Sequence, residues 1–150
     1  MQKCTLALGC FWKPEEDFKN KPGILETEVG YAGGKKANIS YEEVCLGDSG
    51  HAEVVRLTFD ESIISYRKIL ELFFKMHDPT QKNMQYPDIG TQYRSEIFYE
   101  SEEQRLLANK IKDEFNDKYY KKKIETNISK INNYCKAEEY HQKYIEKKLK

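Results

Sequence analysis

Cys10 is the residue whose type and position most clearly suggest chemistry. It lies in Gly9-Cys10-Phe11-Trp12, after an apolar and partly β-branched run at residues 4–8 that is typical of a buried strand. Gly9 permits a turn, and Pro14 with the acids after it favours the start of a helix. A helix N-terminus favours negative charge, so we expect a thiol that ionises readily, the more so if Lys13 points back at it. The alternative is a small buried cysteine between core aromatics, because free cysteine is among the most buried residue types.

The other three cysteines, Cys4, Cys45 and Cys135, add no recognisable metal-binding pattern. The four cysteines include no Cys-x-x-Cys pair, which argues against a structural zinc site, so we expect no bound metal. The apolar run before Cys10 is too short for a signal peptide, so we expect a cytoplasmic protein. Cysteines in that compartment are expected to be thiols, and any disulfide to be transient and catalytic.

The composition is that of a soluble globular chain. Charged residues make up 33% and hydrophobic residues 39% of the 150 residues, which suits one domain with a real core. Residues 118–150 hold ten lysines against four glutamates, a net charge of +6 that leaves −6 for residues 1–117. Because Tyr, Ile and Glu are interleaved with these lysines, we interpret the basic end as a solvated helix face and expect no nucleic-acid partner. No stretch approaches the ~18 apolar residues of a membrane span, so we expect no membrane association.

The hydrophobic pattern predicts strands and helices that alternate along the chain. Strands are expected at residues 4–8, 24–32, 51–60, 93–99 and 123–128, and helices at residues 11–20, 39–45, 63–76, 101–120 and 137–149. Ser40 and Glu43 fit a capping box for the second helix, and Ser62 is expected to cap the third. Residues 81–93 are expected to form a long irregular loop, a kind of segment that is often functional. The alternation predicts an α/β (α+β) fold with a mixed β-sheet and helices packed on it.

The expected strand at residues 51–60 combines polar and apolar residues in the period-two pattern of a half-buried strand. Its polar members, His51, Glu53 and Arg56, are expected largely to share one face. Taken alone, Glu53 could be a surface acid of that strand. Asp88 could likewise serve only to shape the turn after a proline, and Tyr41 could be a packing residue.

Six segments, in order along the chain, together resemble one enzyme family. They are Gly9-Cys10-Phe11-Trp12, Gly30-Tyr31-Ala32-Gly33-Gly34, Gly47-Asp48-Ser49-Gly50-His51-Ala52-Glu53, His77-Asp78-Pro79-Thr80, Gly90-Thr91-Gln92-Tyr93-Arg94-Ser95 and Ala137-Glu138-Glu139-Tyr140-His141-Gln142. The family that they resemble is peptide-methionine (S)-S-oxide reductase, the MsrA family, and the resemblance covers nearly the whole chain. It implies a two-layer α/β sandwich with a ferredoxin-like core, formed by one catalytic domain over residues 1–150.

The resemblance also implies the reaction, which is the reduction of methionine S-sulfoxide, free or in proteins, to methionine through a cysteine sulfenic acid. By motif position, Cys10 matches the nucleophile that attacks the sulfoxide sulfur, and Glu53 matches the acid that protonates the departing oxygen. The other matched site residues are Tyr41 and Tyr93, whose hydroxyls hydrogen-bond that oxygen, Phe11 and Trp12, which form the pocket for the S-methyl group, and Asp88, which helps to orient the substrate. These residue types suit the reaction, because a buried carboxyl keeps its proton at neutral pH and phenols stabilise charge that develops on oxygen.

Two features depart from the pattern of the family. Lys13 stands where many members have glycine, and the sequence ends at Lys150 without the glycine-rich tail that carries recycling cysteines in many members. The sulfenic acid would then be reduced by Cys135, by Cys4, or directly by an external thiol such as thioredoxin, glutaredoxin or a small dithiol. We interpret Cys45 as a buried structural residue, and we expect a monomer that needs no bound cofactor.

Two other classes of function are weighed against this one. A thiol peroxidase also passes through a cysteine sulfenic acid, but it would consume peroxide and would not need the Phe11-Trp12 pocket. A non-enzymatic alternative is a metal- or methionine-binding module built from Cys4, Cys10, His51 and His77, whose spacing argues against it.

Overall fold

A six-stranded sheet organises the chain. The computed structural model describes residues 1–149. The strands of this sheet are β1 (Gln2–Leu8), β2 (Ile24–Ala32), β3 (Ala52–Phe59), β6 (Ser95–Tyr99), β7 (Asn127–Lys130) and β8 (Cys135–Lys136), in the order β7-β6-β1-β3-β2-β8. Strands β6 and β7 are parallel and the other neighbours are antiparallel. The sheet is therefore mixed, as predicted.

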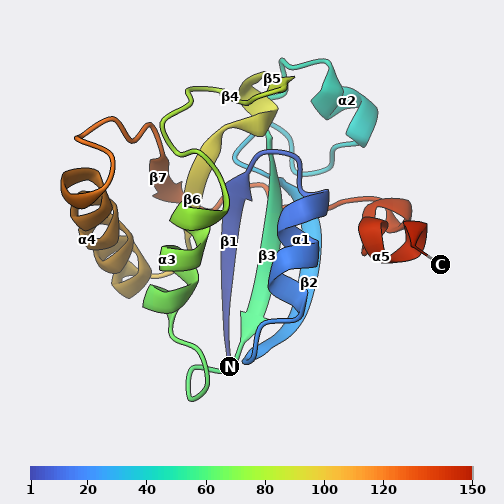
Figure 1. Cartoon of the computed structure of the whole chain (residues 1–150). Coiled ribbons are helices and arrows are strands. Elements are labelled where there is room, and N and C mark those ends of the chain that lie inside the picture. The colour runs from blue at the N-terminus through green and yellow to red at the C-terminus, as the bar shows by residue number, and fades with distance from the viewer. Residues whose placement is uncertain (150) are drawn as a thin grey trace.

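Three longer helices, α1 (Trp12–Lys19), α3 (Tyr66–Met76) and α4 (Glu102–Lys118), lie against one face of this sheet (Figure 1). That face carries the larger core, in which alternate strand residues pack on apolar helix residues; its members include Leu6, Leu8, Val29, Val55, Leu57, Ile97, Phe18, Phe73, Phe74 and Ile111. The opposite face has a smaller cluster of Ala7, Ala32, Ala52, Val54 and Phe98, covered in part by Ile131 and Tyr134. The result is the predicted fold of a mixed sheet with helices packed on it.

The remaining elements are short. They are helices α2 (Tyr41–Cys45) and α5 (Tyr144–Lys148), the hairpin of β4 (Met84–Gln85) and β5 (Asp88–Ile89), and 3₁₀ turns at Thr91–Tyr93 and Glu139–His141. The capping box predicted for α2 is present, because the Ser40 hydroxyl accepts from the Glu43 N–H while the Glu43 carboxylate accepts from the Ser40 N–H. Within residues 1–149, no helix has the length and apolar character that a membrane span requires.

The prediction that the polar residues of β3 share one face is wrong. Because side chains alternate along a strand, Glu53 lies on the helix-covered face with Val55, whereas Arg56 lies on the opposite face. There Arg56 pairs with Glu100 at 2.7 Å. Glu53 is only 1% exposed, since β3 runs between β1 and β2 and both of its faces are covered. Burial of this carboxyl is the feature on which the chemistry below depends.

Several predicted element boundaries also need correction. Helix α3 is capped by Ser65, whereas Ser62 forms a turn with the Asp60 carboxylate. The predicted irregular loop at residues 81–93 contains the β4–β5 hairpin and a 3₁₀ turn. The predicted strand at residues 123–128 begins only at Asn127. The predicted terminal helix is interrupted at Lys143, whose backbone is left-handed with φ of 54°, so only α5 is helical beyond it.

A buried carboxylate anchors the C-terminal segment to the rest of the fold. Glu15 of α1 is 1% exposed and accepts hydrogen bonds from the Lys143 backbone N–H at 2.7 Å and from the Thr27 hydroxyl at 2.7 Å. The Lys143 ammonium lies 3.0 Å from the same carboxylate. These bonds hold the segment that carries His141 and Tyr144 against α1.

We expect Glu15→Ala to lower the free energy of unfolding by about 2–4 kcal/mol, because it leaves a buried hydroxyl and a backbone N–H without an acceptor and a cation without its partner. Urea unfolding measures this change. Glu16→Ala is the matched control on the same helix, since its partly exposed pair with Lys19 contributes at most ~1 kcal/mol. Equal losses for the two variants would contradict the anchoring role of Glu15.

Candidate active site

Cys10 lies where β1 ends and α1 begins. Gly9 makes the turn with φ of +94°, and a Cβ added there would approach the Gln85 side chain to 2.8 Å, so both backbone shape and space favour glycine. The turn leaves Cys10 partly exposed between the end of β1 and the start of α1. The predicted strand–turn–helix position of Cys10 is thus what the structure shows.

The first N–H groups of this helix are shared between a thiol and a carboxyl. The Phe11 N–H donates to Glu53 Oε1 at 3.2 Å, and the Trp12 N–H donates to the Cys10 sulfur. Free N–H groups at a helix start stabilise negative charge, so this arrangement can support either a thiolate or a carboxylate. It brings Cys10 and Glu53, which are 43 positions apart in the sequence, to one helix terminus.

The structure contradicts the prediction of an acidic Cys10. Burial, followed by the charge of Glu53, raises the pKa of the Cys10 thiol to about 12, although the hydrogen bond from the Trp12 N–H acts to lower it. Lys13 does not help, because its ammonium pairs with Asp17 at 2.5 Å, on the outside of α1. The thiol is therefore protonated in the resting site, and its ionisation depends on the state of its carboxyl neighbour.

Glu53 is a carboxyl that holds its proton at neutral pH. Burial, with a smaller contribution from the charge of Asp88, raises its pKa to about 8, although the hydrogen bond from the Phe11 N–H acts to lower it. A carboxyl with such a pKa can donate a proton near pH 7, which is the property that a general acid needs. Since a charge on Glu53 raises the pKa of Cys10, the thiol ionises more easily while the carboxyl is neutral.

Tyr41, Tyr93 and Asp88 approach this pair from other elements. Burial, followed by the charge of Glu53, raises the pKa of Tyr93 to about 12, and the charges of Asp88 and Cys10 contribute. Burial also raises the pKa of Tyr41, which begins α2 and whose phenol hydrogen-bonds the Cys45 side chain. Both phenols therefore stay protonated and can donate hydrogen bonds. The structure brings these three predicted residues within electrostatic range of Cys10 or Glu53.

Phe11 and Trp12 belong to an aromatic cluster that includes residues the sequence prediction had not placed in the site. Trp12 stacks on Tyr144 with ring centroids 3.8 Å apart and an interplanar angle of 10°. Its indole N–H donates to His141 Nδ1 at 3.1 Å, and the His141 ring lies 4.4 Å from that of Tyr41. Burial lowers the pKa of His141, so the ring is neutral and can accept. No local spacing signal marked Tyr144, which joins the cluster only because the C-terminal segment folds back on α1.

Tyr31 is a second residue to which the sequence analysis assigned no role in the site. It is fully buried and pairs directly with Glu53 across β2 and β3, so the two side chains share a face of the sheet. Its hydroxyl donates to Glu138 Oε1 at 2.9 Å, and the other oxygen of Glu138 accepts from the Tyr41 N–H at 2.9 Å. Glu138 thereby ties the start of α2 to the central sheet.

The other cysteines lie in three different environments. Cys4 is fully buried in β1, where its backbone lies opposite that of Leu57 in β3. Leu57 is four residues, or ~13 Å along the strand, from Glu53. Cys135 pairs with Tyr31, so its backbone is two strand spacings, ~10 Å, from that of Glu53. Cys45 is exposed at the end of α2, so the prediction that it is a buried structural residue is wrong.

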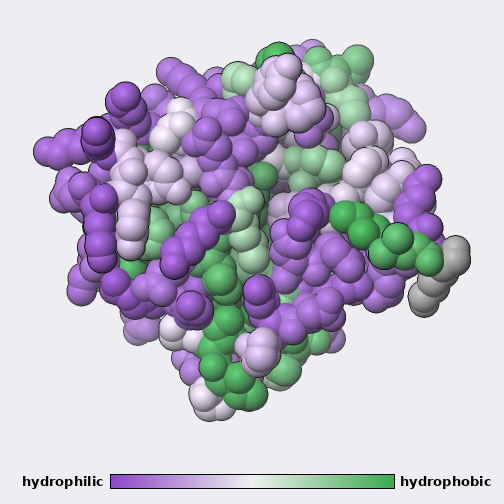
Figure 2. Space-filling view, viewed as in Figure 1, coloured by the Kyte–Doolittle hydropathy of each residue, from purple (hydrophilic) through white to green (hydrophobic). Residues whose placement is uncertain are grey.

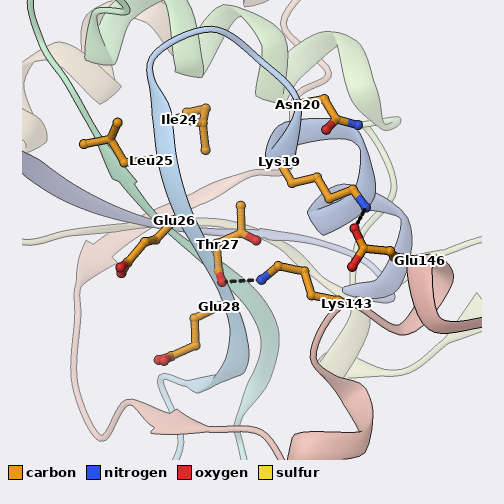
Figure 3. Close-up of a pocket in the computed structure, with 9 residues that line it drawn as sticks. All are labelled: Lys19, Asn20, Ile24, Leu25, Glu26, Thr27, Glu28, Lys143 and Glu146. Carbon is orange, nitrogen blue, oxygen red and sulfur yellow. Dashed lines mark hydrogen bonds and ion pairs between the residues drawn. The ribbon is translucent and has the colours of Figure 1, made fainter.

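A groove of about 480 Å³ elsewhere on the surface is not part of this site. It is lined by β2, the end of α1 and the C-terminal segment, and includes Lys19, Glu26, Lys143 and Glu146 (Figure 3). The Lys143 ammonium donates to the Thr27 carbonyl at 2.9 Å, so it helps to hold the segment in place. No cysteine lines the groove.

The residues of the proposed metal-binding alternative do not converge. Both ring nitrogens of His77 are engaged, Nδ1 with the Phe73 carbonyl and Nε2 with the Ser95 hydroxyl, each at 2.7 Å. His51 Nε2 donates to the Lys36 carbonyl at 2.7 Å. Over residues 1–149, no group of three or more His, Cys, Asp or Glu is arranged to hold a metal ion.

Comparison with known proteins gives a consistent result over almost the whole chain. A family model described as "Peptide methionine sulfoxide reductase" matches residues 2–150. Peptide methionine sulfoxide reductase MsrA of Pelagibacter ubique is 51% identical over 148 residues, which are 99% of this chain and 100% of that protein. The crystal structure of Mxr1 from Saccharomyces cerevisiae in reduced form has a TM-score of 0.94 at 39% identity, over 99% of this chain and 86% of that one. Mxr1 in complex with Trx2 matches with a TM-score of 0.68 at 28% identity, over 95% of this chain and 84% of that one.

Proposed function

Because the chain belongs to the peptide methionine sulfoxide reductase family, we propose that Cys10 and Glu53 together carry out the reaction of that family at the start of α1. The chain reduces methionine S-sulfoxide, free and in proteins, to methionine through a cysteine sulfenic acid. This membership favours the reductase over the thiol peroxidase and the binding module. One observation carries the assignment of roles: backbone N–H groups at the start of one helix donate hydrogen bonds to both the Cys10 sulfur and the Glu53 carboxyl.

Glu53 supplies the proton that the sulfoxide oxygen needs. Below about pH 8 its carboxyl is neutral, and it can hydrogen-bond an oxygen that Tyr41 and Tyr93 also hold by their hydroxyls. Two such donors, fixed in a partly buried site, stabilise the charge that develops on the oxygen, each by about 1–3 kcal/mol. A neutral Glu53 also removes one of the charges that raise the Cys10 pKa. Protonation of the carboxyl therefore favours both the leaving oxygen and the attacking sulfur.

The atoms and electrons of this step balance without a further reactant. Cys10 attacks the sulfoxide sulfur and forms a sulfur–sulfur bond while the oxygen takes the Glu53 proton. That bond and the sulfur–oxygen bond of the substrate then break as the hydroxyl is transferred to the Cys10 sulfur, which leaves a sulfenic acid on Cys10 and releases methionine. The thiol proton of Cys10 returns to Glu53, so the carboxyl is regenerated. The Cys10 sulfur loses two electrons and the methionine sulfur gains them. Phe11 and Trp12 provide the apolar wall for the S-methyl group, and Asp88 orients the rest of the substrate.

We assign reduction of the sulfenic acid to an external thiol of the thioredoxin type. Cys10 is partly exposed, so an external thiol can reach its sulfur, whereas Cys4 is fully buried. Cys135 is the second candidate, because it shares the sheet face of Tyr31 and Glu53, but the buried Tyr31 strand separates it from that carboxyl. The relative Mxr1 forms a complex with Trx2, which supports a reductant of this class. Glutaredoxin or a small dithiol would reach the same sulfur. We further propose a monomeric cytoplasmic enzyme with one catalytic domain and no bound cofactor.

Cys135→Ser distinguishes these two routes. We expect turnover of methionine S-sulfoxide with a thioredoxin system to stay within about twofold of the wild type, because an external thiol does not need this residue. Steady-state assays with thioredoxin and with dithiothreitol measure it. A loss of tenfold or more with both reductants, together with a Cys10–Cys135 disulfide in the wild type, would assign recycling to Cys135.

A further inference from the structure

Gln85 is a polar residue beside the candidate active site that has no part in the reaction described above. It lies in β4, the strand that forms a hairpin with β5, which begins at Asp88. Its amide bonds both backbone groups of one residue, because the oxygen accepts from the Asp78 N–H at 3.2 Å and the nitrogen donates to the Asp78 carbonyl. Gln85 therefore ties the hairpin to the segment that follows α3.

The segment that receives these bonds is itself fixed to the core. Asp78 comes directly after His77, whose ring nitrogens bond the Phe73 carbonyl and the Ser95 hydroxyl, each at 2.7 Å. Burial lowers the pKa of His77 to about 4, so the ring is neutral and one nitrogen donates while the other accepts. Gln85 thus joins the hairpin to a part of the chain that the core holds in place.

The apolar stem of Gln85 covers the turn that presents Cys10. A Cβ added to Gly9 would lie 2.8 Å from Gln85 Cγ and 2.9 Å from Gln85 Cβ, so the stem is in close contact with that turn. Gln85 lies directly opposite Asp88 in the hairpin, and directly opposed residues of an antiparallel pair point to the same face. The Asp88 side chain therefore lies on the face of the hairpin that is turned toward Cys10. Figure 1 shows the hairpin at the end of the sheet where β1 ends and α1 begins.

The electrostatics of the site agree with this placement of Asp88. Burial is the largest cause of the raised pKa of Glu53 and of Cys10, and the charge of Asp88 adds to both. Burial and, to a smaller extent, the same charge also raise the pKa of Tyr93. Strand β4 packs against the 3₁₀ turn that carries Tyr93, so the hairpin borders the reacting groups on two sides.

We propose that Gln85 is a positioning residue for the reduction of methionine S-sulfoxide, which holds the hairpin so that the Asp88 carboxylate stays beside Cys10. This role rests on the proposed function. Gln85 acts through Asp88, the residue that orients the substrate, and not on the reacting atoms themselves. Its bonds matter to the rate because a displacement of about 1 Å in the groups that position a substrate can cost ~10²-fold.

Gln85→Met tests this role, because methionine keeps the length of the stem over Gly9 and removes only the amide. We expect kcat/KM for methionine S-sulfoxide, with dithiothreitol as reductant, to fall about 10- to 100-fold at pH 7. The midpoint of urea unfolding should change little. Asp78 is exposed, and the surface over the segment that follows α3 is mostly hydrophilic (Figure 2), so water can bond the freed backbone groups.

The pH profile distinguishes positioning from a general weakening of the fold. In the wild type the rate should fall as Glu53 loses its proton near pH 8. Because the charge of Asp88 contributes to that pKa, a loosely held hairpin should move the fall to lower pH, and Asp88→Asn should move it in the same direction. If Gln85 acts through Asp88, the double variant should lose no more than about twofold beyond the larger single loss.

Gln104 on α4 provides the matched control, because its amide is held in the same way. It is 5% exposed, accepts from the Glu100 N–H at 2.8 Å and donates to the Lys3 carbonyl at 2.9 Å. Lys3 lies near the start of β1, at the other end of the strand from Cys10. Gln104→Met should lower the urea midpoint more than Gln85→Met does, since its bonds are buried, yet keep kcat/KM within about twofold and the pH profile unchanged.

Unchanged kcat/KM together with an unchanged pH profile in Gln85→Met would overturn the proposal. Losses that multiply in the double variant would overturn it too, because Gln85 and Asp88 would then act independently. An equal loss of kcat/KM in Gln104→Met would do the same, since the effect would then follow stability. In each of these outcomes the wild type still releases methionine, whereas a wild type that releases none would contradict the proposed function itself.

Discussion

Replacing Cys10 by Ser is expected to abolish turnover, with a loss of at least roughly three orders of magnitude in kcat. A serine hydroxyl at this helix start keeps the hydrogen bond from the Trp12 N–H but cannot accept the sulfoxide oxygen to form a sulfenic acid. The measurement is the release of methionine from methionine S-sulfoxide with excess dithiothreitol. Because the change is nearly isosteric, the variant should keep the wild-type unfolding transition.

The exposed Cys45 provides the matched control for this variant. Cys45→Ser removes a thiol at the rim of the same site, where it hydrogen-bonds the Tyr41 phenol. It is expected to lower kcat by less than about tenfold, because serine retains a hydrogen-bonding group next to Tyr41. Turnover that persists in Cys10→Ser and vanishes in Cys45→Ser would transfer the role of nucleophile to Cys45.

Glu53→Gln is expected to slow the reduction step about 10²- to 10³-fold at pH 7, the range that a positioned general acid contributes. The glutamine carbonyl can still accept the Phe11 N–H that Glu53 Oε1 accepts at 3.2 Å, but the amide has no acidic proton to give. Trp12 is the only tryptophan of the chain, so its fluorescence can follow a single turnover. Glu26→Gln, an exposed carboxyl on β2, is the control and should react at the wild-type rate.

The pH dependence of that rate separates a proton donor from a merely structural carboxyl. The pKa of Glu53 is raised to about 8, so the acid form predominates below pH 8 and the wild-type rate should fall as pH rises through that value. Glu53→Gln should lose this falling limb. It should also lower the pKa of Cys10 below about 12, because the charge of Glu53 is one cause of its rise, and alkylation of Cys10 by iodoacetamide measures that pKa. A falling limb that survives in the variant would defeat the assignment.

The sequence predicted the elements whose signals are local. The strand at Ile24–Ala32 and the capping box at Ser40 depend on residues within a few positions of one another, and both appear as expected. The terminal helix was predicted too long, because Lys143 adopts a left-handed backbone in order to place its N–H and its ammonium on the buried Glu15. That constraint comes from another part of the chain and has no local signature.

The sequence predicted which residues form the site more completely than it predicted their chemistry. Motif positions named Cys10 and Glu53, but the helix-terminus argument predicted an acidic thiol, whereas burial and the nearby carboxyl dominate and raise its pKa. The sequence pattern did not predict that both faces of β3 are buried. Glu53 and Arg56 are both polar members of that pattern, although their side chains lie on opposite faces of the sheet. Tyr144 could not be predicted, since its stacking on Trp12 depends on how the C-terminal segment folds back.

Mass spectrometry of the protein after one equivalent of methionine S-sulfoxide, without reductant, tests the central claim most directly. The claim predicts one added oxygen atom on the peptide that contains Cys10, trapped as a sulfenic acid by dimedone, and one methionine released per chain. The Glu53→Gln variant, treated in the same way, should acquire the oxygen on Cys10 far more slowly at pH 7. Oxygen on another cysteine, or methionine released while Cys10 stays unmodified and outside any disulfide, would contradict it.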